Sequence, residues 1–242
     1  MKLQSDTKNR RLLATMTNEP FQPVRLYYSI PDRSVVTEKL GALKCMLEVP
    51  PERCWQWLYQ AEAATIRFPT GGYDDVPKEK RPIVLGRIRF PNNGGMTLET
   101  NSIPRAIEGA RFFGPRLGSE VVAIRARIVN RCFAADEGKL DELVKTIDRD
   151  VTVVDPREGE AAFARDFERA AGEFMERKLA SREDVPMVED FPLAPEEETP
   201  EFRYLATTLQ LRSIRAQEHW LGNTHLTLAA IIVQAVKENA QG

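Results

Sequence analysis

Two segments of the chain alternate between apolar and charged residues with a period of two, the period of a β-strand that buries one face. In one segment, Ile124, Ala126 and Ile128 share one parity. A shift of one residue would exchange the two faces, so the alternation fixes which side chains lie together. If the two strands are neighbours, we expect one charged patch on the outer face of a sheet. Its arginines are Arg87 and Arg89 in residues 83–90, and Arg125, Arg127 and Arg131 in residues 120–131.

Other segments complete the pattern of a mixed α and β protein. Helix signals occur at 35–47 and 103–118, where Ser102 and Pro104 suit the first turn of the second helix. The order strand, helix, three strands, helix, strand matches a ferredoxin-like βαββαβ module with an extra hairpin strand. We therefore expect an α+β module over residues 21–132 with helices on one face of the sheet. The expected strands are 23–30, 54–59, 83–90, 96–101 and 119–131.

The two ends of the chain differ from this module. Residues 1–20 are polar and basic, which favours a flexible arm. Residues 133–242 favour a mostly helical module, with an apolar stripe within 157–183 and two further helices after residue 201. An acidic, proline-containing segment at 184–201 is typical of a linker.

The charge of the chain is unevenly distributed along its length. The whole chain carries a formal charge of −2 at pH 7. Residues 1–132 hold 21 Lys and Arg against 13 Asp and Glu, a charge of +8, whereas residues 133–242 hold 13 against 23, a charge of −10. Either the two halves neutralise each other in one body, or the basic half faces an anionic partner.

Composition narrows the class of protein. The longest apolar run near the C-terminus, LTLAAIIVQAV, is too short to cross a bilayer, and the N-terminus lacks the apolar core of a signal peptide. We therefore expect a cytoplasmic protein that does not contact a membrane. The chain has three cysteines, Cys45, Cys54 and Cys132, without CxxC spacing. Its two histidines are too few to suggest a zinc site with them. Buried free thiols are expected rather than a zinc site, and neither a metal nor a cofactor is predicted.

Four stretches also resemble a family of uncharacterised bacterial proteins over roughly the first 135 residues. The resemblance implies that 21–132 is one module, and it implies no activity and no site. The stretches are PVRLYYSIPDRS, CWQWLYQAEA, KEKRPIVLGRIRF and RAIEGARFFGPRLGSEVVAIRARIVNR.

Arginines at this density can hold phosphates in bidentate geometry and can stack on bases. Sheet surfaces that bind single strands also need aromatic rings. Tyr27, Tyr28, Trp55, Trp57 and Tyr59 are available, and of these we expect Tyr28, Trp55 and Trp57 to stack on the ligand. The leading hypothesis is a non-enzymatic binding or accessory protein that contacts RNA or single-stranded DNA through its basic sheet face. The competing interpretation is that the arginines pair internally with the acidic second half.

Two other functional classes stay open. A metal-dependent hydrolase or nuclease would use scattered acids such as Asp74, Asp75 and Glu99. A structural subunit would join another protein, or a second copy of this chain, through the amphipathic helices within 199–238. No GxSxG turn or other catalytic motif is present, so no catalytic residue is predicted.

Overall fold

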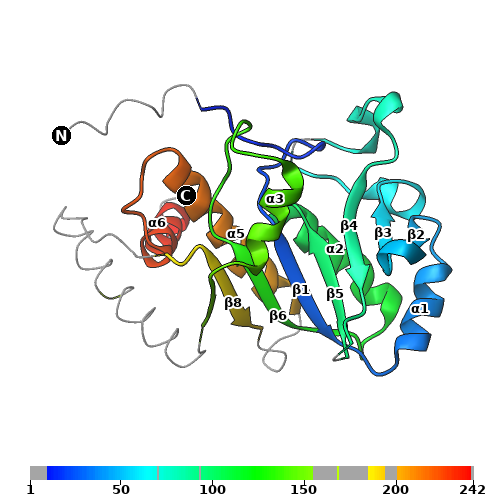
Figure 1. The fold of residues 1–242 in the computed structure, drawn as a ribbon. Coiled ribbons are helices and arrows are strands. Elements are labelled where there is room, and N and C mark those ends of the chain that lie inside the picture. The colour runs from blue at the N-terminus through cyan, green and yellow to red at the C-terminus, as the bar shows by residue number, and fades with distance from the viewer. Residues whose placement is uncertain are drawn as a thin grey trace.

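A computed structural model of the protein describes residues 10–69, 71–92, 94–154, 168, 185–193 and 201–240. Its centre is one mixed sheet (Figure 1). The strands are β1 (Val24–Ser29), β2 (Met46–Val49), β3 (Cys54–Leu58), β4 (Val84–Arg89), β5 (Met96–Thr100), β6 (Val122–Val129), β7 (Val151–Val153) and β8 (Val188–Pro192). Their order across the sheet is β2-β3-β4-β5-β1-β6-β8-β7. Neighbouring strands are antiparallel, except that β7 and β8 are parallel.

Five α-helices lie within the described ranges. They are α1 (Arg33–Gly41), α2 (Ile103–Leu117), α3 (Leu140–Val144), α5 (Glu201–Trp220) and α6 (Leu228–Ala240). Short 3₁₀ helices complete the connections: η2 (Pro50–Glu52), η3 (Ala61–Thr65), η4 (Tyr73–Asp75), η5 (Lys78–Lys80) and η6 (Lys145–Asp148). The α+β class expected from the sequence is therefore confirmed, with an eight-stranded mixed sheet.

The main core lies between the sheet and the helices on one side of it. Leu26, Ile88 and Leu98 project from the sheet and are almost fully buried. Side chains of α1, α2 and α5 belong to the same apolar cluster. On the opposite side, α3 and η6 cross one end of the sheet, and Figure 1 shows α3 in front of it. We call this second side, away from α2 and α5, the open face.

The start of α2 follows the expected pattern. The Ser102 hydroxyl accepts a hydrogen bond from the Arg105 backbone N–H, and Pro104 occupies the first turn. The first helix is shorter than predicted, because α1 ends at Gly41 and the chain then turns into β2. Glu62 stabilises this turn by accepting hydrogen bonds from the backbone N–H groups of Lys44 and Cys45.

The second half of the chain shares the same sheet. β7 and β8 come from residues beyond 132, so the sheet crosses the expected boundary between the two modules. The segment 184–201 is not simply a linker, because its described part, 185–193, contains β8, paired with β6. The helix expected at 157–183 lies outside the described residues, apart from Glu168, which is helical.

The polar arm expected at residues 1–20 is described from Arg10 onward. Leu13 donates its N–H to the carbonyl of Phe133 at 2.8 Å, and Phe21 donates to the carbonyl of Leu13 at 2.9 Å. Ala135 also donates to the carbonyl of Arg11 at 2.8 Å. These bonds hold the described part of the arm against the segment that follows β6.

Leu26→Ala tests the position of the core. Leu26 is fully buried at the centre of the sheet, so the substitution should lower the free energy of unfolding by about 3 kcal/mol through lost burial and a residual cavity. Val153→Ala is the control, because Val153 is 73% exposed and its loss should cost less than about 0.5 kcal/mol. Urea denaturation measures both. Equal midpoints for the two variants would contradict this core.

Candidate functional site

A row of charged side chains crosses the open face at right angles to the strands. Arg87 pairs in register with Glu99, which pairs with Arg25 of the central strand. Arg25 in turn lies directly opposite Arg127, which pairs with Asp190 of β8. These five residues therefore form one continuous row across β4, β5, β1, β6 and β8.

A second row runs beside the first. Arg89 pairs with Thr97, Thr97 with Tyr27, and Tyr27 with Arg125. The guanidinium carbon of Arg125 lies 3.8 Å from the centre of the Tyr27 ring, as in a close cation–π contact. The open face therefore carries an aromatic ring as well as arginines.

Carboxylates neutralise the centre of the first row. The Arg25 Nε donates to Glu99 at 2.8 Å, and its Nη1 donates to Asp148 of η6 at 2.7 Å. Arg127 also donates to Asp148, at 2.9 Å, and forms an ion pair with Asp190 at 2.7 Å. The side chains of Arg25 and Arg127 are each only 17% exposed. These two arginines therefore have carboxylate partners within the fold.

The ion pair shifts the pKa values of Arg25 and Asp148 in opposite directions. Burial opposes the charge of Arg25, but the hydrogen bond to Asp148 and the charge of Glu99 outweigh it, so the pKa of Arg25 is raised. The hydrogen bond from Arg25 and the nearby charge of Arg127 hold the pKa of Asp148 below its ordinary value. Both partners stay charged at neutral pH, so the ion pairs are intact there.

Three arginines at the edges of the rows are more open. The side chains of Arg87, Arg89 and Arg125 are 39%, 38% and 43% exposed. Arg89 contacts Glu99 at 3.3 Å, and Arg125 contacts Asp190 at 3.4 Å. Arg89 also donates to the Glu52 carbonyl at 2.7 Å. Ion pairs between exposed groups contribute little to stability, which applies to Arg87 with Glu52. Asp190 is only 1% exposed, but it keeps Arg127 as a partner at 2.7 Å when Arg125 turns to a ligand.

The structure brings four of the five predicted arginines together on the open face. The fifth, Arg131, lies beyond the end of β6. There it pairs with Glu137 and stacks on Phe133, with its guanidinium carbon 4.3 Å from the ring centre. Arg131 is therefore not part of the two rows.

The three aromatic residues expected to stack on a ligand do not reach the open face, which corrects that prediction. Tyr28 shares the parity of Leu26, and Trp55 and Trp57 pair with Ile88 and Gly86, so all three project toward the helices. Tyr28, Trp55 and Trp57 are 5%, 9% and 0% exposed. The strand assignments left open which parity of each strand faces the helices.

Sequence reasoning missed three members of the site, Arg25, Asp148 and Asp190, and it named Tyr27 as an available ring without choosing it for stacking. Arg25 and Tyr27 alternate with Val24 and Leu26, so the period of two could have found them. No local pattern marks Asp148 or Asp190, because only the tertiary fold brings them to the arginines.

Other predicted features can be placed as well. The three cysteines are buried and free, as expected, and burial raises the pKa of the Cys132 thiol to about 12. No group of three or more potential metal ligands occurs among the described residues, and Glu99 contacts Arg25 and Arg89, so the metal-dependent hydrolase stays a prediction. Within the described part of the chain, no helix is long and apolar enough to span a membrane.

The amphipathic stripe of α5 serves the core. Leu205 and Leu209 are buried in the main apolar cluster, whereas Ile214 and, just after the helix, Leu221 are exposed. Binding of a partner chain through 199–238 stays a prediction.

No family model matches this chain, and neither a curated protein nor a solved structure is similar enough to match it.

Asp148→Asn tests the bridge between the two central arginines. The variant removes the carboxylate that both Arg25 and Arg127 contact, but the Asp148 side chain is 52% exposed. We therefore expect a loss of about 1 kcal/mol in the free energy of unfolding at neutral pH. Because the pKa of Asp148 is lowered by folding, this contribution is complete above the ordinary value of 3.8 and disappears as the pH falls through the folded value.

Urea denaturation from neutral to acidic pH measures the effect. The difference in the free energy of unfolding between the wild type and Asp148→Asn should persist down to about pH 5 and disappear in stronger acid. The exposed Asp136 supplies the control variant, Asp136→Asn, which should match the wild type. A gap that survives unchanged in strong acid would show that the carboxylate charge is not its cause.

Proposed function

We propose that the protein is a non-enzymatic binding or accessory protein that holds a single-stranded polynucleotide, RNA or single-stranded DNA, on the open face of its sheet. The observation that carries this proposal is the second row. There an Arg125 guanidinium lies on the Tyr27 ring while 43% of its side chain stays exposed. Bases stack on guanidinium planes as well as on aromatic rings.

The exposed cations are suitably distributed for a phosphate backbone. Arg87 and Arg89 lie on β4, and Arg125 lies on β6, with β5 and β1 between them. Three strand spacings separate these two groups, a distance of roughly 14 Å. A single strand that crosses the sheet could therefore contact guanidinium groups at both ends and stack in between.

The carboxylates of the face limit its strength. Glu99, Asp148 and Asp190 already hold Arg25 and Arg127, so we assign phosphate binding to Arg87, Arg89 and Arg125 only. Because Arg87, Arg89 and Arg125 also have carboxylates at 3.7, 3.3 and 3.4 Å, a phosphate has to compete with these longer ion pairs, and the face should bind weakly.

The proposed fold class is consistent with this use. β5, α2 and β6 form a crossover with β1 between the two strands, which is the split βαβ arrangement. We propose that β1, β4, β5 and β6 with α1 and α2 are a ferredoxin-like module, extended by β2 and β3 on one edge and by β8 and β7 on the other.

Binding to a fluorescent single-stranded RNA, and separately to single-stranded DNA, tests the proposal by anisotropy. Three phosphate contacts predict that the logarithm of the association constant falls against the logarithm of salt with a slope of about −2. If neither single-stranded RNA nor single-stranded DNA binds at about 50 mM salt, the proposed function is contradicted, because counterion release is strongest at low salt.

Two substitutions should act in opposite directions. Arg125→Ala removes the stacking guanidinium and should weaken binding at least about fivefold. Asp148→Asn removes a competing negative charge and should strengthen binding. Arg111→Ala is the control, because Arg111 is half exposed on α2, away from the open face. Weaker binding by the Asp148→Asn protein, with the fold intact, would contradict the assignment to this face.

A further inference from the structure

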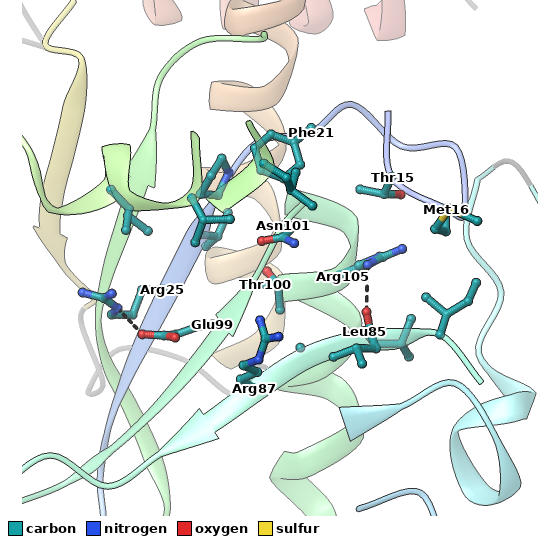
Figure 2. Close-up of a pocket in the computed structure, with 18 of the residues that line it drawn as sticks. Thr15, Met16, Phe21, Arg25, Leu85, Arg87, Glu99, Thr100, Asn101 and Arg105 are labelled. Carbon is teal, nitrogen blue, oxygen red and sulfur yellow. Dashed lines mark hydrogen bonds and ion pairs between the residues drawn. The ribbon is translucent and has the colours of Figure 1, made fainter. Parts of the chain in front are cut away.

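A cavity of about 650 Å³ lies at the end of the open face where the first row begins. Ligand pockets of proteins are commonly about 300–1,000 Å³. Its walls come from the arm at 13–16, the segment 21–25 that leads into β1, the segment 80–87 that leads into β4, the end of β5, the start of α2, and α3 with η6. Figure 2 shows Thr15 and Met16 of the arm above Arg87 and Leu85 of β4.

The lining combines an apolar wall with an excess of positive charge. Leu13, Phe21, Leu85, Leu140 and Val144 supply apolar surface. Five cationic side chains line the cavity against three acidic ones. A lining of this kind suits a ligand that has an apolar body and an anionic group.

Of the cationic side chains, Arg87 is the one best placed to meet an anion. Its Nε is buried and has no hydrogen-bond partner among the described residues. The carboxylate paired with it, that of Glu52, is 3.7 Å away, which is beyond hydrogen-bond length. In Figure 2 the Arg87 guanidinium is directed toward Thr100 and Asn101, which also line the cavity.

The neighbouring arginines are already engaged. Arg25 is held by Glu99 and Asp148. Arg105, at the cavity wall, forms an ion pair with Glu19 at 3.3 Å and donates to the carbonyl of Val84 at 3.2 Å. Lys145 pairs with Glu142 at 2.8 Å, and Lys80 is exposed. Arg87 is 39% exposed and, among the arginines of the lining, lacks a carboxylate at hydrogen-bond distance within the described residues.

A buried polar network fixes the arm that forms one wall. The side chains of Glu19 and Arg105 are 1% and 4% exposed. Thr17 accepts from the Arg105 Nη2 at 2.6 Å and donates to Glu19 at 2.9 Å, and Thr15 also donates to Glu19. The arm is thereby fastened to the start of α2, so the cavity exists before a ligand arrives, which reduces the entropy lost on binding.

We propose that this cavity is a binding site for a small organic anion. The anionic group, a carboxylate or a phosphate monoester, binds Arg87, and the apolar body packs against Leu140, Val144 and Leu13. The site is additional to polynucleotide binding and does not rest on it, although Arg87 belongs to both surfaces.

A series of probes with one apolar body and different head groups tests the site by calorimetry. The probes are 1-naphthyl phosphate, 1-naphthoate and the neutral 1-naphthalenemethanol. Fragments of this size bind well-formed pockets with dissociation constants near or below about 1 mM. We expect at least one anion to bind in this range and the neutral alcohol to bind about tenfold more weakly. Comparison of the two anions identifies which head group the site prefers.

Two variants separate the head-group contact from the apolar wall. Arg87→Ala should bring the affinity of the anions down to that of the alcohol, whereas Leu140→Ala should weaken all probes that bind. Leu140 and Leu47 are both 50% exposed, and Leu47 lies on β2 outside the cavity, so Leu47→Ala is a matched control for folding and binding. Arg111→Ala is the control for the loss of a positive charge.

Three results would overturn the site: no probe binds, the alcohol binds as well as the anions, or Arg87→Ala leaves the preference for anions unchanged in a protein whose urea midpoint matches the wild type. Because the probes are not polynucleotides, their failure leaves the proposed function of the open face untouched. Loss of polynucleotide binding alone leaves the cavity site untouched in turn.

Discussion

The pairing of Arg25 with Arg127 across two adjacent strands is the constraint on which the open face depends. The two residues are direct cross-strand partners, and like charges in such positions repel. Both side chains are also largely buried, which makes an unpaired charge costly. Asp148 offsets the repulsion between the two positive charges, because its carboxylate contacts both guanidinium groups, at 2.7 and 2.9 Å. η6 therefore stabilises this end of the sheet, together with Glu99 and Asp190.

β8 forms ion pairs of the same kind on both faces of the sheet, including the face that the helices cover. Its successive residues Glu189 and Asp190 point to opposite faces, and each meets arginines there. Glu189 pairs with Arg212 of α5 at 2.6 Å, while Asp190 pairs with Arg127 at 2.7 Å. Burial opposes the charge of Glu189, but the bonds from Arg212 outweigh it and lower the pKa of that carboxyl. One short strand thus joins the basic first half of the chain to both α5 and η6.

These contacts explain what the sequence could and could not predict. The alternation of Arg87, Arg89, Arg125 and Arg127 identified a shared face, because side-chain parity in a strand is a local property. The parity of Tyr28, Trp55 and Trp57 was equally regular, but a regular parity does not tell which face the helices cover. The segment around Glu189 and Asp190 had the composition of a solvated linker, yet both residues are buried. Their partners are distant in sequence, so only the fold could reveal that these charges are neutralised.

The anion binding that we propose takes place on a face that also carries the carboxylates of Glu99, Asp148 and Asp190. Internal neutralisation, the first interpretation of the charge asymmetry, holds for the central arginines, and an anionic partner, the second, is what we propose for the arginines at the edges of the rows. The central arginines are neutralised from within, which keeps the sheet stable without a ligand. Arg87, Arg89 and Arg125 keep more than a third of their side chains exposed, so a phosphate can reach them without the desolvation that a fully buried arginine would require. Asp148 lies beside the central pair and is half exposed, so its charge contributes to the stability of the sheet and, in the function that we propose, opposes the binding of anions.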